Sequence, residues 1–145
     1  MIRVQSDPFE ASEELRAFQA RHQDAGAVSS FTGYVRAEDG QVSALILQHY
    51  PGFTESQIEQ INEDALNRFD VQDTLIIHRW GRMEPGEPIV LVAAAAAHRK
   101  PALQAVDFLM DYLKTDAPFW KKEDTPKGSA WIEPRKQDYA SRNDW

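Results

Sequence analysis

Three lysines and the aromatic pair Phe119-Trp120 lie close together around a proline between residues 110 and 123. Lys114 ends a helical pattern, Pro118 breaks it, and Lys121 and Lys122 follow. An amine held beside apolar side chains is partly shielded from water, which lowers its pKa and suits it to proton transfer. The segment therefore indicates a cationic or proton-transferring site. A helix that ends in lysine and continues into a solvated lysine pair is the ordinary alternative.

A second group of basic residues is suited to binding an anion. His98 and Arg99 directly precede the helix that Lys114 ends, where free backbone N–H groups and the helix dipole favour negative charge. Arg36 ends an earlier strand pattern. We predict that these three residues form an anion pocket, although a surface arginine beside a helix start needs no ligand.

Several common kinds of site are missing from the sequence. There is no phosphate-binding glycine loop, no nucleophile elbow around serine and no His-Glu-x-x-His helix. The chain has no cysteine, which excludes disulfides, thiolate metal sites and cysteine nucleophiles. The four histidines, His22, His49, His78 and His98, are not spaced like a local metal site. We therefore expect neither a metal nor a bound cofactor.

Length and charge restrict the classes of protein that fit. A chain of 145 residues predicts one domain over residues 1–145, and a net charge of -7 argues against binding to nucleic acid. Residues 98–145 hold 9 of the 16 Lys and Arg, so this nearly neutral third is where an anion would be tolerated. No apolar run approaches the roughly 18 residues of a membrane span, and the first residues do not resemble a signal peptide. We expect a cytoplasmic protein without a membrane segment.

The elements that must position these residues follow from periodicity. We predict a helix from Asp7-Pro8 or Ser12, and another from Thr54 with Gln57 completing a capping box. The second helix should bury a stripe of five apolar residues, Ile58, Ile61, Ala65, Leu66 and Phe69. A third helix should carry Pro101 in its first turn and run to Lys114.

Strand patterns fill the remaining chain. Residues 27–36 are rich in β-branched and aromatic residues, and with a second strand at 42–50 they predict one hairpin. Residues 74–80 and 88–92 predict a second hairpin. The alanines at 93–97 should continue the last of these strands. A polar loop should follow Pro118, then a short strand at 129–133 and a charged tail.

The end of the predicted helix also gives Lys114 and Lys121 different expected surroundings. Lys114 follows Met110 by one turn, so we expect its stem to border the apolar face and its amine to lose part of its hydration. Lys121 lies beyond Pro118, where we expect more exposure. On this interpretation Lys114 transfers protons and Lys121 supports it with charge.

Five segments together resemble the large, catalytic subunit of molybdopterin synthase. In order they are residues 26–36, 78–87, 97–99, 111–114 and 118–123, with Trp131 after them. Each segment is short, but their order and spacing cover nearly the whole chain, and the lysine pair around Phe119-Trp120 is the most diagnostic part.

The resemblance implies an α+β fold with a hammerhead-like arrangement, in which antiparallel hairpins pack with helices. It implies a sulfurtransferase that converts cyclic pyranopterin monophosphate to molybdopterin by forming the dithiolene. The sulfur would come from the C-terminal Gly-Gly thiocarboxylate of a small ubiquitin-like carrier subunit. Two large subunits would form the homodimer at the centre of a heterotetramer.

Roles are carried over only where residues match. The resemblance implies that Lys114 and Lys121 are the catalytic lysines. It also implies a substrate-binding set consisting of Arg36, His98, Arg99, Phe31, Met110 and Arg135, with Arg135 approaching the neighbouring subunit's site.

The chain departs from the family pattern in two places. Gln48 replaces a frequent glutamate, and the turn at 37–40 is short. Two other classes fit the same chain: a dimeric binding module without catalysis, and a structural domain whose lysines are surface groups.

Overall fold

Strand β6 is apolar along nearly its whole length, so it can be buried on both faces. In the computed structural model, which describes residues 1–145, β6 is a central strand of a four-stranded sheet with the order β1-β4-β6-β2. In chain order the elements are β1 (Ile2–Gln5), α1 (Ala11–Arg21), β2 (Ala27–Tyr34), β3 (Ala44–His49), α2 (Phe53–Arg68), β4 (Asp73–Arg79), β5 (Gly81–Met83), β6 (Pro88–Ala96), α3 (Arg99–Thr115), β7 (Phe119–Thr125), β8 (Gly128–Ile132) and α4 (Lys136–Asn143). The prediction that the alanine run continues a strand is confirmed.

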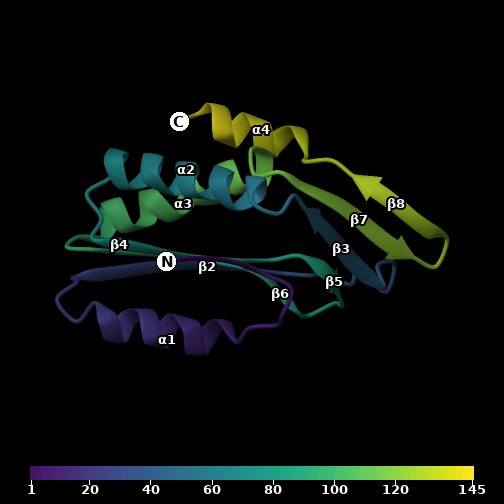
Figure 1. Cartoon of the computed structure of the whole chain (residues 1–145), viewed down its shortest axis with the longest axis horizontal. Coiled ribbons are helices and arrows are strands. Elements are labelled where there is room, and N and C mark those ends of the chain that lie inside the picture. The colour runs from purple at the N-terminus through teal and green to yellow at the C-terminus, as the bar shows by residue number, and fades with distance from the viewer.

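Side chains of β6 alternate between two cores. Val90 and Val92 pack with residues of α2 and α3, whereas Leu91 and Ala93 pack on the other face with Phe18 of α1. Figure 1 shows α1 below this sheet and α2 and α3 above it. The α+β class predicted from the sequence is therefore confirmed, with helices on both faces of a largely antiparallel sheet.

A second sheet has the order β5-β3-β7-β8 and is antiparallel throughout. One of its faces is buried through Leu45, Leu47 and Met83, which pack with Val35 and Phe119. In Figure 1 this sheet extends to the right of the first, and α4 follows it and lies over α3. The second sheet places Lys121 and Lys122 next to the end of α3.

The first predicted hairpin is wrong. Strand β2 pairs with β6, whereas β3 pairs with β5 and β7, so residues 37–43 cross from one sheet to the other. The local turn signal indicates a change of direction but does not say which strand supplies the hydrogen bonds. A long-range close approach contributes, because a Cβ on Gly26 would come within 2.1 Å of the Ala97 carbonyl oxygen. The second predicted pairing, β4 with β6, is confirmed.

Four other local predictions need correction. The first residue of α1 is Ala11 rather than Ser12 or Asp7-Pro8, and no side chain caps it. Leu66 is 38% exposed, although Ile58, Ile61 and Ala65 are buried as predicted. The segment after Pro118 is strand β7 rather than a polar loop, because β3 and β8 pair with both of its edges. The charged tail forms helix α4, which packs against α3.

The predicted capping box at Thr54 is also wrong. Helix α2 begins after Gly52, whose N–H donates to the Glu55 carboxylate. Thr54 is fully buried instead: its Oγ1 accepts from the Tyr50 N–H at 2.9 Å and donates to the Pro118 carbonyl at 3.1 Å. This hydroxyl therefore joins the start of α2 to the proline corner.

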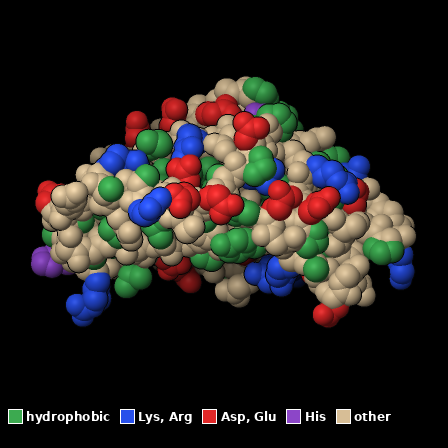
Figure 2. Space-filling view, turned by 90° about the horizontal axis from the view of Figure 1, so that it is seen from below, with side chains coloured by type: hydrophobic (Ala, Val, Ile, Leu, Met, Phe, Trp, Pro, Cys, Tyr) green, Lys and Arg blue, Asp and Glu red, His purple; other side chains and the backbone are tan.

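The face of the molecule on which α1 lies carries both positive and negative side chains. Figure 2 shows Lys and Arg side chains interspersed with Asp and Glu, and hydrophobic side chains scattered among them. This face therefore presents no single broad region of one charge. None of the helices is both long enough and apolar enough to cross a membrane.

Candidate functional site

The end of α3 and the start of β7 meet at a rigid corner. Pro118 is held by the Thr54 hydroxyl, and the next residue, Phe119, stacks on His78 with ring centroids 4.0 Å apart and planes at 15°. His78 belongs to β4, in which residues alternate between the two cores. Three elements that are distant in sequence therefore converge beside Lys114 and Lys121.

His78 is held as a neutral imidazole. It is 8% exposed, and its Nδ1 lies 2.9 Å from the Arg79 carbonyl oxygen. A carbonyl only accepts, so Nδ1 carries the proton. Burial, with a smaller contribution from the positive charge of Lys114, lowers the pKa of His78 to about 4, although the backbone hydrogen bond to Arg79 opposes the shift.

Lys121 is the more buried of the two central lysines. It lies in β7 between Leu47 of β3 and Ile132 of β8, and it is half-buried. Burial lowers the pKa of the Lys121 ammonium, and the charges of Lys114 and Arg36 lower it as well. The carboxylates of Glu123 and Glu38 partly oppose this shift in pKa. Lys114 and Arg36 are therefore both close enough for their charges to act on Lys121.

The predicted order of burial is reversed, because Lys114 is exposed. Seven residues make almost two helical turns, so Lys114 returns to the solvent-facing side on which Asp107 lies. The neighbouring Met110 is partly buried against the core, as its spacing from Leu113 and Val106 allows. Lys121 gains its burial from strands on both sides, which the sequence pattern did not reveal.

Arg36 lies just beyond β2 and is free to meet a ligand. Its guanidinium is exposed and forms an ion pair with Glu38 at 3.3 Å. Such a surface pair contributes little stability and can be exchanged for another anion. Glu38 and Asp39 both have left-handed backbone angles, with φ of 51° and 58°, so the short turn is tightly wound.

Two apolar residues line the same side of the first sheet. Phe31 of β2 is 45% exposed and lies opposite Val92, which packs in the core beneath α3. A Cβ on Gly33 would be 3.3 Å from the Phe31 ring, so glycine leaves room for that ring. Phe31 and Met110 therefore provide apolar surface on the α3 side of the sheet.

A single copy of the chain does not bring all predicted site residues together. His98 and Arg99 are exposed at the first turn of α3, whereas Lys114 lies in its last turn. Their Cα atoms are about 22 Å apart along the helix, given a rise of ~1.5 Å per residue. Arg135 is the N-cap of α4, where its N–H donates to Asp138 at 2.9 Å and its side chain is exposed.

Gln48 lies in an aromatic cleft on the outer face of the second sheet. The cleft has a volume of about 260 Å³ and is lined by Gln48, His49, Tyr50, Trp120 and Trp131. Gln48 is directly opposite Trp120, whose indole N–H donates to the Tyr50 hydroxyl. The replacement of a frequent glutamate by Gln48 therefore affects this cleft rather than the lysine pair.

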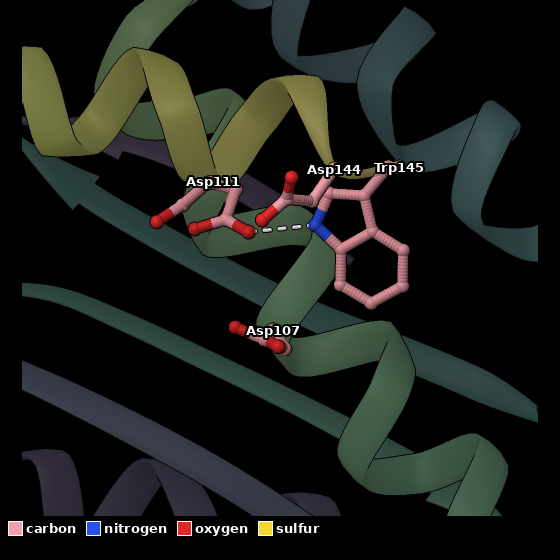
Figure 3. Close-up of a pocket in the computed structure, with 5 residues that line it drawn as sticks. Asp107, Asp111, Asp144 and Trp145 are labelled. Carbon is pink, nitrogen blue, oxygen red and sulfur yellow. Dashed lines mark hydrogen bonds between the residues drawn. The ribbon is translucent and has the colours of Figure 1, made fainter.

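A larger hollow, with a volume of about 300 Å³, carries negative charge, opposite in sign to Lys114 and Lys121. It is lined by Asp107, Asp111, Ser141, Asp144 and Trp145, which Figure 3 shows between α3 and α4. Burial and the neighbouring carboxylates raise the pKa of Asp111, although its hydrogen bond from the Trp145 indole, 2.6 Å long, opposes this. An acidic hollow repels phosphate and carboxylate ligands, so it does not suit the anions considered above. No group of three or more His, Asp or Glu side chains is arranged to hold a metal ion.

Sequence reasoning considered His78 only as a possible metal ligand and so missed its place at this corner. The available signal was the position of His78 directly after the apolar run from Leu75 to Ile77, on the side of the strand shared with Thr74 and Ile76. Its contact with Phe119 depends on the Pro118 corner, which brings together residues about 40 positions apart.

Comparison with known proteins gives one consistent result. Residues 4–116 match the family model described as MoaE protein. The chain is 48% identical to a molybdopterin synthase catalytic subunit of Caulobacter vibrioides, over 100% of this chain and 97% of that protein. It is 49% identical to the subunit of that name from Pseudomonas aeruginosa, over 99% and 97%.

Solved structures agree over the same length. The molybdopterin biosynthesis MoaE protein of Burkholderia ambifaria is 45% identical, with a TM-score of 0.84 over 100% of this chain and 97% of that one. A structure of molybdopterin synthase from Staphylococcus aureus is 30% identical, with a TM-score of 0.80 over 90% and 95%. The matches therefore extend across both sheets and the lysine corner.

Proposed function

The chain belongs to the MoaE family, the catalytic subunits of the enzyme molybdopterin synthase, and from this premise we propose that it transfers sulfur to cyclic pyranopterin monophosphate. The sulfur donor is the thiocarboxylate at the C-terminal Gly-Gly of a small carrier subunit. The product is the dithiolene of molybdopterin. The observation that carries the proposal is the convergence of positive charge at one corner, where half-buried Lys121 lies within the influence of both Lys114 and Arg36.

Positive charge is the first contribution of this corner. The phosphate of the pterin and the thiocarboxylate of the carrier are both anions, and they repel each other when they approach. Arg36 and Lys114 are exposed and can reach both groups, which lowers that repulsion and orients the reactants. Arg36 needs only to exchange its surface partner Glu38 for the ligand.

Proton transfer is the second contribution, and we assign it to Lys121. Its lowered pKa makes the neutral amine more accessible than in a solvated lysine. Lys114 contributes to this state because its charge acts on both Lys121 and His78. Removing Lys114 should therefore disturb two neighbours as well as ligand binding.

The phosphate end of the site requires a second copy of the chain. His98 and Arg99 are too far along α3 to reach Lys114 of their own copy, yet both are exposed beside free backbone donors. We assign them, with Arg135, to the site of the neighbouring copy in a homodimer. Phe31 and Met110 supply the apolar surface against which the pterin ring packs.

A turnover assay tests the central proposal. The purified chain is mixed with thiocarboxylated carrier and cyclic pyranopterin monophosphate, and the dithiolene product is measured by mass spectrometry. The wild-type chain should form product, and carrier that ends in an ordinary carboxylate should give none. Tight binding of both ligands without product would favour a binding module instead.

Mixed dimers test the shared site. Lys114→Ala and Arg99→Ala chains are each expected to be inactive alone. When they are mixed and allowed to exchange subunits, one of the two sites in each mixed dimer regains both residues. Activity should then recover to about a quarter of wild type, as random pairing of a two-fold symmetric dimer requires. No recovery, with exchange verified by mass spectrometry, would place all these residues in one copy's site.

A further inference from the structure

The hydroxyl of Thr54 lies where β3 ends and β7 begins. These strands pair antiparallel, and the pair of residues at this end of their ladder is His49 with Phe119, so the next residues outward are Tyr50 and Pro118. Proline has no N–H to donate, so Tyr50 and Pro118 cannot exchange the two hydrogen bonds of an ordinary antiparallel pair. This end of the ladder therefore needs another hydrogen-bonding group.

Thr54 supplies that group from the first turn of α2. Its Oγ1 accepts from the Tyr50 N–H at 2.9 Å and donates to the Pro118 carbonyl at 3.1 Å. The Thr54 N–H donates in turn to the Tyr50 carbonyl at 2.9 Å. A backbone N–H only donates and a carbonyl only accepts, so the hydroxyl proton can point in one direction alone. The side chain thus takes the place of a direct bond between the two strands.

Burial makes this bridge hard to replace. Thr54 has no exposed surface, although it lies in the first turn of a helix. A hydrogen-bonding group that loses its partner inside a protein costs more than one at the surface, because water cannot readily take the partner's place. Loss of the hydroxyl should therefore loosen the contact between α2 and the proline corner.

Pro118 is also the joint between the two lysines. Lys114 lies four residues before it in the last turn of α3, and Lys121 lies three residues after it in β7. The chain changes direction at this proline, whose carbonyl the Thr54 hydroxyl holds. The next residue, Phe119, lies on the same face of β7 as Lys121, because side chains alternate along a strand. The position of Pro118 therefore sets where β7 starts and where Lys121 lies.

We infer that Thr54 is a positioning residue, whose buried hydroxyl holds the Pro118 carbonyl to the end of β3 and so fixes Lys121 relative to Lys114. The inference rests on the proposed function of the lysine corner and extends it to a residue of α2 outside the predicted site. In this role Thr54 contacts no reactant, because it acts through the backbone of the corner.

A hydroxyl suits this position because one atom must both accept and donate. Valine has nearly the shape of threonine but can do neither, whereas serine keeps the hydroxyl and lacks only the methyl group. Threonine is β-branched, so it also restricts rotation about χ1 and keeps Oγ1 in place. Substitution of Thr54 by valine and by serine therefore separates hydrogen bonding from the filling of space.

Turnover of these two variants tests the inference. Thr54→Val should lower kcat per folded molecule by about tenfold, because a displaced Lys121 transfers protons less efficiently. The value of KM should change little, since Arg36 and Lys114 are exposed and still bind the reactants. Thr54→Ser should recover most of the lost kcat. A loss in Thr54→Ser as large as that in Thr54→Val would overturn the inference.

Thr74→Val is the matched control. Thr74 of β4 is also buried, and its hydroxyl donates to Asn62 of α2 at 2.5 Å, so the same chemical group is removed from another place in the core. Both valine variants should melt at a lower temperature than the wild type, but only Thr54→Val should lose kcat. Equal kcat values in the two valine variants would show that the Thr54 hydroxyl is merely structural.

NMR of lysine-labelled protein tests the position of Lys121 without turnover. Burial lowers the pKa of the Lys121 ammonium in the wild type. A loosened start of β7 admits water, so in Thr54→Val this pKa should rise toward its ordinary value of 10.5, whereas in Thr74→Val it should not change. An unchanged pKa of Lys121 in Thr54→Val would overturn the inference.

The wild-type chain offers a test that needs no substitution. The Tyr50 N–H donates to a buried hydroxyl, so its hydrogen exchange should be as slow as that of the paired residues of β3. Exchange at the rate of an open loop would show that the bridge is absent and would overturn the inference. If the wild-type chain forms no dithiolene, the proposed function fails, whereas the NMR results still decide whether Thr54 holds β7 in place.

Discussion

Lys114, Lys121 and Arg36 form the lysine corner near the C-terminal end of α3, and the acidic hollow lies between α3 and α4. The two regions differ in whether their charged groups have partners within the chain. Burial shifts a pKa toward the neutral form in each: downward for Lys121 and upward for Asp111. In the hollow, Asp111 accepts from the Trp145 indole, and outside its lining Arg142 of α4 donates to Asp116, the C-cap of α3, at 3.1 Å. At the corner, Lys114 is exposed, and the positive charges of Lys114 and Arg36 both act on Lys121.

This difference separates a structural contact from a binding site. The hollow is the larger of the two described cavities, yet its groups are used to attach α4 to α3. The corner concentrates positive charge and leaves it available, an arrangement that costs stability unless a ligand is bound. The sign and the availability of the charge therefore identify the site better than cavity volume does.

The largest expected effect is on turnover at the corner. Lys114→Ala should lower kcat/KM by roughly 100-fold or more, because both anion binding and the influence on Lys121 are lost. Asp107→Asn, two turns earlier on the same side of α3, should leave turnover near wild type. Comparable losses in the two variants would remove the distinction between the corner and the hollow.

The second expected effect concerns stability at the hollow. Trp145→Ala should lower the free energy of unfolding by about 2 kcal/mol, since a half-buried indole is removed. That ring packs edge-on against Phe69 and Phe108 and donates to Asp111. Denaturant unfolding measures the change, and turnover per folded molecule should stay within about twofold of wild type. A large fall in kcat with unchanged stability would show that the hollow takes part in the reaction.

A smaller effect should separate activity from stability at Lys121. Lys121→Met removes a partly desolvated ammonium while keeping an apolar stem, so the melting temperature should rise by roughly 2 °C as turnover falls. Because the folded pKa is lowered, the folded state binds fewer protons between that pKa and the ordinary value of 10.5. As pH rises through this window, the free energy of unfolding of the wild type should therefore increase relative to that of the variant. A melting temperature below wild type at neutral pH would count against the desolvation of Lys121.

The smallest effect is expected at Asp111. Asp111→Asn keeps an oxygen that can accept from Trp145 and removes the repulsion from Asp107 and Asp144. The pKa of Asp111 in the folded state is raised above its ordinary value of 3.8. The free energy of unfolding of the wild type therefore falls as pH rises from that ordinary value to the raised one. The variant should therefore be slightly more stable at pH 7, and the difference should narrow on acidification. A variant that is less stable at pH 7 would show that the carboxylate charge itself holds the indole.

The sequence alone determined the parts of this protein that depend on local spacing. The apolar run of β6, the buried stripe from Ile58 to Ala65 and the helix that begins near Pro101 follow from periods of two and 3.6 residues. The basic residues and the lysine pair around Pro118 were visible for the same reason, and with them the family resemblance. Local patterns are sufficient here because neighbouring residues share one helix or one strand.

Only the tertiary structure decided which of these elements meet. The partner of β2 proved to be β6 rather than β3, because hydrogen bonds between strands are made across long distances in sequence. Lys121 is buried by β3 and β8, and His78 is fixed by Phe119 through the corner that Thr54 holds. The burial of Lys121 and His78 and their lowered pKa values arise from these contacts between distant segments, so no local pattern could reveal them.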